Sequence, residues 1–369
     1  MRRRAWLLNA AAQAALPALA WAASPIDDSS IRRGRALRFP RDHGAHLGAK
    51  IEWWYVTGWL GSEAAPSHGF QLTFFRSRTG LAEGNPSRFA ARQVLFAHAA
   101  VTDLTAGTHH HAEHIARWSG DPAARPAHAS ERDTDVQLFD WTLKRDGIDG
   151  RSGYTARLPT PRFDIALQLE RRQPLLLQGD AGFSRKGPDE RQASHYYSEP
   201  QLGVVGQVAL TGRDTSAQTG RAWLDHEWSD QLLHPEAVGW DWIGINLFDG
   251  SALTAFRLRR RDGSTLWAGG SWRAASGAAR SFKPDEVRLT AGRRWTSPAT
   301  TASYPVQWTV ETPAGRFELR ALLDGQELDS RSSTGTVYWE GLSELLADDG
   351  RRVGLGYLEL TGYAGAIRL

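Results

Sequence analysis

The sequence predicts an all-β protein with two tandem antiparallel β-barrels. Short runs of alternating apolar and polar residues follow one another at close spacing, whereas helical periodicity is scarce. Asp-Gly pairs separate several of these runs, and such pairs favour two-residue hairpin turns. The chain has 369 residues, which is more than one hydrophobic core usually supports, so two domains are expected.

Residues 1–23 have the features of a signal peptide, with a basic start, an apolar Ala/Leu stretch and a small-residue exit. Arg3 and Arg4 give it a weak resemblance to the twin-arginine signal. Pro17 and the small apolar side chains make this segment a poor membrane anchor, and no later run reaches the roughly 20 apolar residues that a spanning helix needs. We therefore expect a periplasmic or secreted protein without a stable transmembrane anchor.

The amino-acid composition excludes several kinds of site and partner. The chain has no cysteine, which excludes disulfides, thiolate metal sites, a cysteine nucleophile and a lipoprotein anchor. Its 16 tryptophans indicate that rigid rings fill the interior and line the cavities. The net charge of +3 comes from scattered arginines rather than a basic stripe with exposed rings, so nucleic acid is not an expected partner.

The first domain is expected over residues 35–190. It opens with the strand IEWWYVTGWL, in which Glu52 and Trp54 lie on one face and Trp53 lies on the other. Further alternating runs follow at close spacing. The histidines of TAGTHHHAEH follow a turn-like Thr-Ala-Gly; we interpret them as a solvated loop, with a metal site as the alternative.

A polar passage over residues 184–193 is the expected domain boundary, and the second domain is expected over residues 195–369. Three Asp-Gly pairs predict hairpins in this half: Asp249-Gly250, Asp262-Gly263 and Asp349-Gly350. The aromatic, acid-bearing strand GWDWIGINL echoes the strand that opens the first half.

The stretch GRAWLDHEWSDQL contains the densest group of chemically competent side chains. In a strand, Asp225 and Glu227 share one face, while His226 and Trp228 lie on the other. Neighbouring acids can divide the roles of proton donor and base, and the imidazole adds a group that titrates near neutral pH. The alternative is a turn in which both acids cap backbone amides and His226 is a satisfied polar residue of the core.

Asp241 is a second candidate acid. It shares a strand face with Ile243, and an acid in such company loses hydration, which raises its pKa unless a cation compensates. The alternative is a structural acid at a strand end that binds backbone amides or an arginine. The rings that point the other way are Trp240 and Trp242. Tyr197, in SHYYSEP, is expected either to pack or to reach a site where the two barrels meet.

The sequence lacks the motifs of several other enzyme classes. The sequence has no Gly-rich phosphate loop after a strand, no HExxH and no GxSxG. We therefore expect no cofactor and no metal, and serine-hydrolase chemistry of the α/β type is not expected.

Several segments resemble the family that contains the carotenoid 1,2-hydratases and the AttH proteins. They extend from about residue 39 to residue 363 and are IEWWYVTGWL, FAHAAVTD, LLLQGDAGFSRKGP, YYSEPQLGVVGQVALTG, GRAWLDHEWSDQLL, GWDWIGINLFDG, VYWEG and GYLELTGY. The resemblance implies two lipocalin-like barrels that meet at an aromatic-lined cavity. It also implies that His226 and Trp228 take part in catalysis, because they match the His-x-Trp element of the hydratases. The further Tyr and Asp of the hydratases have no clear counterpart in SALTAFRLRRRDG.

Together these features favour an exported enzyme that binds a long apolar isoprenoid or lipid-like substrate between its barrels and performs acid-initiated hydration or hydrolysis. Asp225 or Asp241 would donate the proton, and His226 or Glu227 would deprotonate the attacking water. The expected substrate-binding residues are Glu52, Trp54, Tyr197, Trp228, Trp240 and Trp242. The alternative is a non-catalytic periplasmic lipid carrier associated with a lipid-export transporter.

Overall fold

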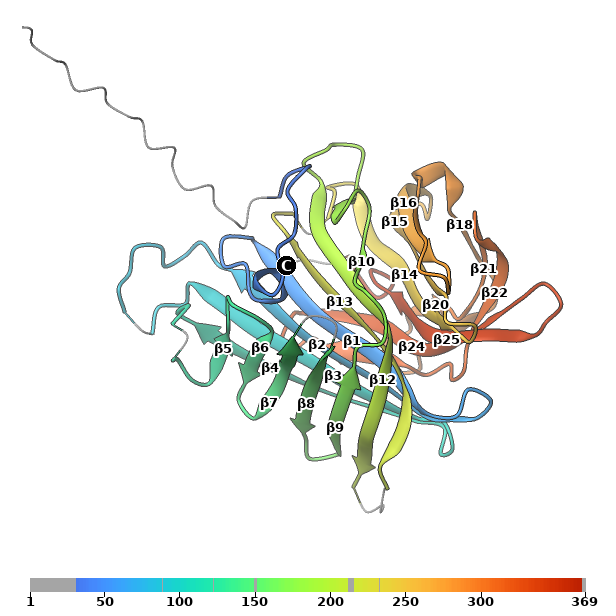
Figure 1. The fold of residues 1–369 in the computed structure, drawn as a ribbon, viewed down its shortest axis with the longest axis horizontal. Helices are drawn as coiled ribbons and strands as arrows, with labels where there is room; N and C mark the ends of the chain where they lie inside the picture. Colours follow the sequence, from blue (N-terminus) through green and yellow to red (C-terminus); the bar gives the residue numbers. More distant parts are fainter. Residues whose placement is uncertain are drawn as a thin grey trace, which may run out of the picture.

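The computed structural model describes residues 31–87, 89–121, 123–148, 151–211, 216–231 and 233–366. The signal peptide expected over residues 1–23 lies outside these ranges. Within them the chain is almost entirely β-structure, arranged as two large antiparallel sheets that lie against each other (Figure 1). The all-β prediction with two lipocalin-like barrels is confirmed.

The first sheet follows the order β4-β3-β2-β1-β13-β12-β9-β8-β7-β6-β5, with β10 and β11 paired to β12. Its two end strands, β4 and β5, come together, so the sheet curls into a nearly closed barrel (Figure 1). Its strands are β1 (Ile51–Gly61), β2 (Pro66–Arg78), β3 (Gln93–Asp103), β4 (Thr108–Trp118), β5 (Ala127–Ala129), β6 (Asp135–Leu138), β7 (Trp141–Ile148), β8 (Arg151–Pro159), β9 (Phe163–Glu170), β10 (Leu176–Leu177), β11 (Phe183–Arg185), β12 (Ala193–Leu210) and β13 (Gln218–Ser229).

The second sheet follows the order β17-β16-β15-β14-β25-β24-β22-β21-β18, with β23 paired to β24. Its strands are β14 (Ala237–Leu247), β15 (Ala252–Arg260), β16 (Thr265–Arg273), β17 (Ala279–Phe282), β18 (Arg288–Ala291), β21 (Gln307–Thr312), β22 (Gly315–Ala321), β23 (Glu327–Ser330), β24 (Thr336–Leu346) and β25 (Arg352–Leu360). A separate hairpin joins β19 (Arg294–Thr296) to β20 (Ser303–Pro305). Two short 3₁₀ helices, η1 (Arg41–His43) and η2 (Pro284–Glu286), complete the described fold. The described part of the chain contains no helix with the length and apolar character needed to cross a membrane.

The boundary between the sheets lies later than the sequence predicted. The polar passage over residues 184–193 connects β11 to β12 inside the first barrel, and the second sheet begins only at Ala237. The reason is the length of β12, which spans 18 residues and pairs with both β9 and β13. A domain starting at residue 195 would remove β12 and β13 from the middle of their own sheet.

The three predicted Asp-Gly hairpins are confirmed. They join β14 to β15, β15 to β16 and β24 to β25. In each turn the glycine has a positive φ, at 90° for Gly250, 84° for Gly263 and 79° for Gly350. L-residues with side chains rarely adopt this conformation, so the turn chemistry fixes the register of these strands.

Hydrophobic packing forms three clusters that together position the site. One fills the first barrel, one fills the second, and a third lies where the barrels meet. In β1 the predicted alternation holds: Trp54 and Val56 belong to the core of the first barrel, whereas Tyr55 belongs to the cluster between the barrels. Both faces of this strand are therefore buried, but in different surroundings.

Candidate active site

Strand β13 divides the predicted catalytic group between two compartments. Asp225 and Glu227 line a cavity between the barrels. Trp228 belongs to the core of the first barrel, and His226 makes its contacts there. The strand alternation predicted this separation into faces. The alternative of a turn with capping acids is wrong, because residues 218–229 form a continuous strand, but the structure agrees with its second part, a hydrogen-bonded His226 in the core.

The cavity has a volume of about 140 Å³. Its walls come from β1, β2, β3, β12 and β13 of the first barrel and from β14, β15, β24 and β25 of the second. Aromatic rings dominate it, among them Trp53, Phe75, Phe96, Trp240, Trp242 and Phe256. The acidic side chains of the described lining are Asp225, Glu227, Glu340 and Glu359. The cavity thus combines an apolar container with an unusual density of carboxyl groups.

Asp225 is held in place by three donors. Its Oδ1 accepts hydrogen bonds from Ser198 Oγ at 2.5 Å and from Trp223 Nε1 at 2.7 Å. Its Oδ2 accepts one from Tyr196 OH at 2.8 Å. Burial raises the pKa of Asp225 to about 7, although the three hydrogen bonds favour the ionised form and partly oppose this effect. Near neutral pH this carboxyl therefore exchanges readily between its protonated and ionised forms.

Glu227 has a different environment, because Lys186 lies beside it. The Lys186 Nζ is 3.0 Å from Glu227 Oε1, and both side chains are largely buried. The same ammonium lies over two rings, 4.7 Å from the centre of the Tyr196 ring and 4.5 Å from that of Phe256. The two acids of β13 thus differ in their partners, because a cation contacts Glu227 whereas neutral hydroxyl and indole groups contact Asp225.

Glu340 and Glu359 form a second acid pair on the opposite wall. They are direct cross-strand partners on β24 and β25. Burial raises the pKa of Glu359 to about 8, and burial together with the neighbouring Glu359 raises that of Glu340 well above its usual range. Both acids are thus expected to be protonated at neutral pH in the empty cavity.

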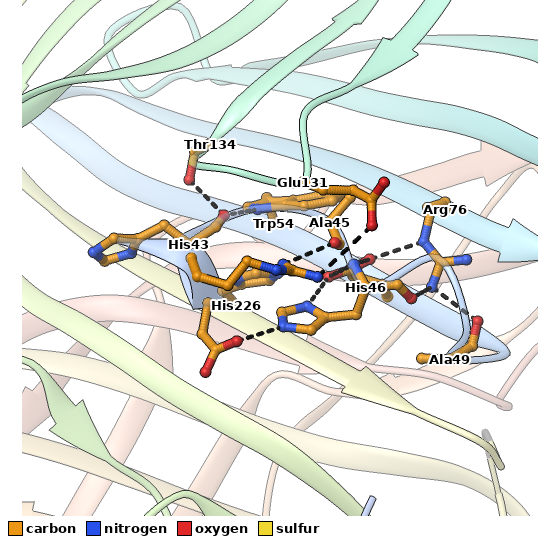
Figure 2. A network of polar contacts seen from close by, with 12 residues as sticks. His43, Ala45, His46, Ala49, Trp54, Arg76, Glu131, Thr134 and His226 are labelled. Atoms are coloured by element: carbon orange, nitrogen blue, oxygen red, sulfur yellow. Dashed lines mark hydrogen bonds and ion pairs between the residues drawn. The ribbon is translucent and has the colours of Figure 1, made fainter. Parts of the chain in front are cut away.

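On the other side of β13, His226 belongs to a buried polar network (Figure 2). Glu52 Oε1 lies 2.9 Å from His226 Nε2 and 2.8 Å from His46 Nδ1, and Glu52 Oε2 accepts a hydrogen bond from Arg76 Nε at 2.8 Å. Burial opposes the ionisation of Glu52, but the Arg76 charge and the histidine contacts hold its pKa well below the usual range. This pairing explains a carboxylate in a strand of aromatic residues.

The rings around this network pack on its imidazoles. Trp54 stacks on His226 with ring centres 4.7 Å apart, and Trp228 stacks on His46 at 3.7 Å. Burial lowers the pKa of His226, so the ring is neutral and its Nε2–H donates to Glu52. Its unprotonated Nδ1 lies 3.1 Å from Tyr197 OH and accepts a hydrogen bond from that hydroxyl. His226 is therefore fully engaged inside the barrel.

His46, Glu52 and His226 also bring three ligand-type atoms within 4.8 Å of one another, which is the one such group among the described residues. The separations of 2.8 and 2.9 Å are hydrogen-bond distances, and Arg76 already neutralises the carboxylate. A dication would have to displace these N–H protons beside a buried guanidinium. We therefore assign this group to the structure of the barrel rather than to a metal site.

Asp241 does not reach the cavity. It is fully buried, with its Oδ2 2.6 Å from Arg257 Nε and its Oδ1 3.0 Å from Arg259 Nε. Tyr363 OH donates a further hydrogen bond to Oδ1 at 2.8 Å. This is the arrangement of the structural alternative, an acid paired with arginine.

The predicted substrate-binding residues separate in the same way. The structure brings Trp240 and Trp242 to the cavity, and places Glu52, Trp54, Tyr197 and Trp228 in the first barrel. The residues that the sequence reasoning missed are Lys186, Tyr196, Ser198, Trp223, Glu340 and Glu359. Strand pairing brings several of them together. Ser198 on β12, for example, lies opposite Asp225 on β13, and the sequence does not reveal this register.

The histidines at 109, 110, 111 and 114 do not lie in a loop, as the sequence suggested, but on β4. An edge strand explains the error, because its alternating histidines are partly buried against neighbours rather than solvated. His109 Nδ1, for example, lies 2.9 Å from the Thr102 hydroxyl on β3. In the described chain these histidines do not gather into a three-ligand group.

Comparison with known proteins identifies a family and structures with the same fold. The family model described as AttH-like matches residues 30–363. The chain belongs to the AttH-like family. The crystal structure of an AttH candidate from Nitrosomonas europaea is 47% identical, covers 92% of this AttH-like chain and 99% of its own, and superposes with a TM-score of 0.82. No curated protein matches the chain.

Two more distant structures share the architecture of this AttH-like protein. Kievitone hydratase from Nectria haematococca is 12% identical, with 92% of this chain and 95% of that chain covered and a TM-score of 0.66. CghA in complex with Sch210972 is 14% identical, with 86% and 89% covered and a TM-score of 0.51. At such low identity these likenesses show the fold alone.

Proposed function

We propose that this AttH-like protein is a hydratase-like enzyme that adds water to a carbon–carbon double bond of an apolar, isoprenoid or lipid-like molecule held between its barrels. One observation carries the proposal. Asp225 is a buried carboxyl with a pKa of about 7 in the wall of an aromatic cavity, and three donors are already aimed at its oxygens. Such an acid gives up its proton to form an anion that its surroundings stabilise without reorganisation.

The first step is transfer of the Asp225 proton to one carbon of the double bond, whose π electrons form the new C–H bond. The other carbon becomes a cation. Trp240 and Trp242 line the cavity, and a ring face turned toward the cation would stabilise this charge by about 0.5–2 kcal/mol in the absence of water. The new Asp225 carboxylate supplies the counter-charge.

In the second step, water adds to the cation through its oxygen and loses a proton to Glu227. Glu227 is the base in this proposal because it is the neighbouring acid on the same face of β13, and the Lys186 ammonium lies 3.0 Å from its Oε1. General-base assistance of this kind typically contributes about 10²- to 10⁴-fold in rate. Return of the proton from Glu227 to Asp225 completes the cycle, so the net reaction consumes one water and no other reactant.

The second candidate is a non-catalytic lipid carrier that serves a lipid-export transporter. The position of His226 and Trp228 favours it, because these residues lie in the barrel core and not in the cavity wall. In either function we propose that the protein acts in the periplasm after export.

The test is incubation of the mature protein with extracts of unsaturated isoprenoids and lipids in heavy-oxygen water, followed by mass spectrometry. The hydratase predicts products that have gained one labelled water. Asp225→Asn should abolish their formation while the apolar ligand still co-purifies, and Asp262→Asn, in an exposed turn, serves as the control. Ligand that is retained by wild type but always released unaltered would contradict the hydratase and favour the carrier.

A further inference from the structure

Lys186 is the one lysine or arginine among the described residues that line the cavity. It follows β11 directly, and its backbone N–H donates a hydrogen bond to the carbonyl oxygen of Gln192 at 2.6 Å. The carbonyl oxygen of the preceding residue, Arg185, accepts a hydrogen bond from Trp267 Nε1 of the second barrel at 3.1 Å. Contacts with both barrels therefore fix the backbone from which this side chain enters the cavity.

The surroundings of the Lys186 nitrogen suit a cation with fewer N–H groups than an ammonium. Its Nζ lies 3.0 Å from Glu227 Oε1, and it packs on the rings of Tyr196 and Phe256, 4.7 and 4.5 Å from their centres. An ammonium has three N–H donors, but this one makes an ion pair and no aligned hydrogen bond within the described chain. An iminium nitrogen has a single N–H, so one carboxylate and two rings would complete its surroundings.

Apolar surface begins at this nitrogen and continues away from it along β14 and β15. Phe256, which contacts the amine, lies directly opposite Trp242 in the strand pairing. The neighbouring cross-strand pair is Trp240 with Leu258. All four side chains line the cavity. A carbonyl group placed at Lys186 would thus be followed by a chain in contact with rings and a leucine, which suits a hydrocarbon.

We propose that Lys186 is a site of covalent ligand attachment, at which the amine condenses with an apolar aldehyde to form a protonated imine. This activity is separate from the proposed hydration, because it requires neither Asp225 nor a double bond in the ligand. The net reaction converts one ammonium and one aldehyde into one iminium and one water, and no oxidant or reductant takes part. The positive charge stays where the carboxyl group of Glu227 and two rings already surround it.

Glu227 can carry the proton that the condensation moves. Lys186 passes one proton to Glu227 Oε1, and the freed lone pair forms a C–N bond to the carbonyl carbon while the C=O π electrons move to oxygen. That oxygen then takes one proton from the nitrogen and the one held by Glu227. It leaves as water, and the nitrogen lone pair closes the C=N bond. The separation of 3.0 Å between Nζ and Oε1 permits direct proton transfer.

The other lysines of the chain provide an internal comparison. Lys50, Lys144 and Lys283 are all exposed. If Lys186 served only as the ion-pair partner of Glu227, its partly buried amine would be shielded and would react with aldehydes more slowly than these three. An attachment site reverses this order, because binding of the apolar chain places the carbonyl group next to the amine.

The experiment is reductive trapping of the mature protein with citral, an isoprenoid aldehyde, and sodium cyanoborohydride at neutral pH, followed by peptide mass spectrometry. Lys186 should be labelled at least about tenfold faster than each of the three exposed lysines. Acetaldehyde, which has no apolar chain, should show no such preference. Labelling of Lys186 that is no faster than that of the exposed lysines, or an equal preference with acetaldehyde, would overturn the proposal.

A variant separates covalent attachment from simple binding. Lys186→Arg keeps a cation beside Glu227 but has no amine that can form an imine, and circular dichroism checks its fold. Without reductant, wild type should bind citral at least about tenfold more tightly than geraniol, the alcohol with the same carbon skeleton. In Lys186→Arg the two affinities should agree within about threefold, whereas Lys50→Arg, at an exposed position, should keep the wild-type preference. A preference for citral that survives in Lys186→Arg would refute the attachment site.

The two proposals fail separately. Asp225→Asn should abolish hydration but leave the labelling rate of Lys186 within about threefold of wild type, since the condensation does not use Asp225. Labelling of Lys186 in a protein that hydrates no ligand would refute the hydratase alone. Hydration activity without selective labelling of Lys186 would refute the attachment site alone.

Discussion

The side chains of Asp225 and His226 lie on opposite sides of one barrel wall, although the two residues are consecutive in the chain. Asp225 faces the cavity between the barrels, and His226 is bound to Glu52 in the interior of the first barrel. A strand with two buried faces can thus serve two purposes at once. Its outward residues line the cavity, and its inward residues hold the barrel together.

We predict that turnover depends on the protonated form of Asp225. Because its pKa is about 7, kcat/KM should fall about tenfold per unit above roughly pH 8. Measurement of the hydration rate from about pH 5 to about pH 9 checks this. In Asp225→Asn the residual rate should lack this limb; a limb that persists in the variant would assign the titration to another group.

The sequence was sufficient to predict which residues share a face of β13, but not whether each face packs in a barrel core or lines a cavity. Alternation correctly separates Asp225 and Glu227 from His226 and Trp228. It does not reveal which side is hollow, because both sides of β13 are buried and rich in rings. That information lies in pairings between residues distant in the chain, such as Glu340 with Glu359 and Ser198 with Asp225.

Glu52→Gln should destabilise the protein rather than act on the reaction selectively. The amide cannot neutralise Arg76, whose guanidinium is fully buried, and breaking such a pair from one side costs about 3–5 kcal/mol. Denaturant unfolding gives the change in free energy. Wild-type stability with a selective loss of turnover would instead bring Glu52 into the active site, as the sequence first suggested.

The same substitution at Glu359, Glu359→Gln, should raise the free energy of unfolding at high pH, whereas Glu52→Gln lowers it. Its folded-state pKa, about 8, lies above the usual value of 4.5, so the native state binds more protons and loses stability as the pH rises through this interval. Glu359→Gln removes this loss. The variant should be about as stable as wild type near pH 4 and more stable by on the order of 1–3 kcal/mol near pH 8. Parallel unfolding curves at both pH values would show that Glu359 is not a buried neutral acid.

Asp241→Asn separates the structural from the catalytic interpretation of this acid. The carboxylate contacts Arg257 and Arg259, and each guanidinium also lies over a ring, Trp308 at 5.0 Å and Tyr363 at 3.8 Å. Removing the negative charge leaves two cations close together at the end of the second barrel, at a cost of about 3–5 kcal/mol.

Turnover per folded molecule, measured well below the melting temperature, should nevertheless match wild type, because the cavity wall contains Trp240 and Trp242 but not Asp241. Asp262→Asn, in the exposed turn after β15, controls for the loss of a carboxylate. Normal stability combined with a loss of turnover of about a hundredfold or more would return Asp241 to the chemistry. The paired arginines make the first outcome the expected one, since both oxygens of Asp241 are bound by Arg257 and Arg259 away from the cavity.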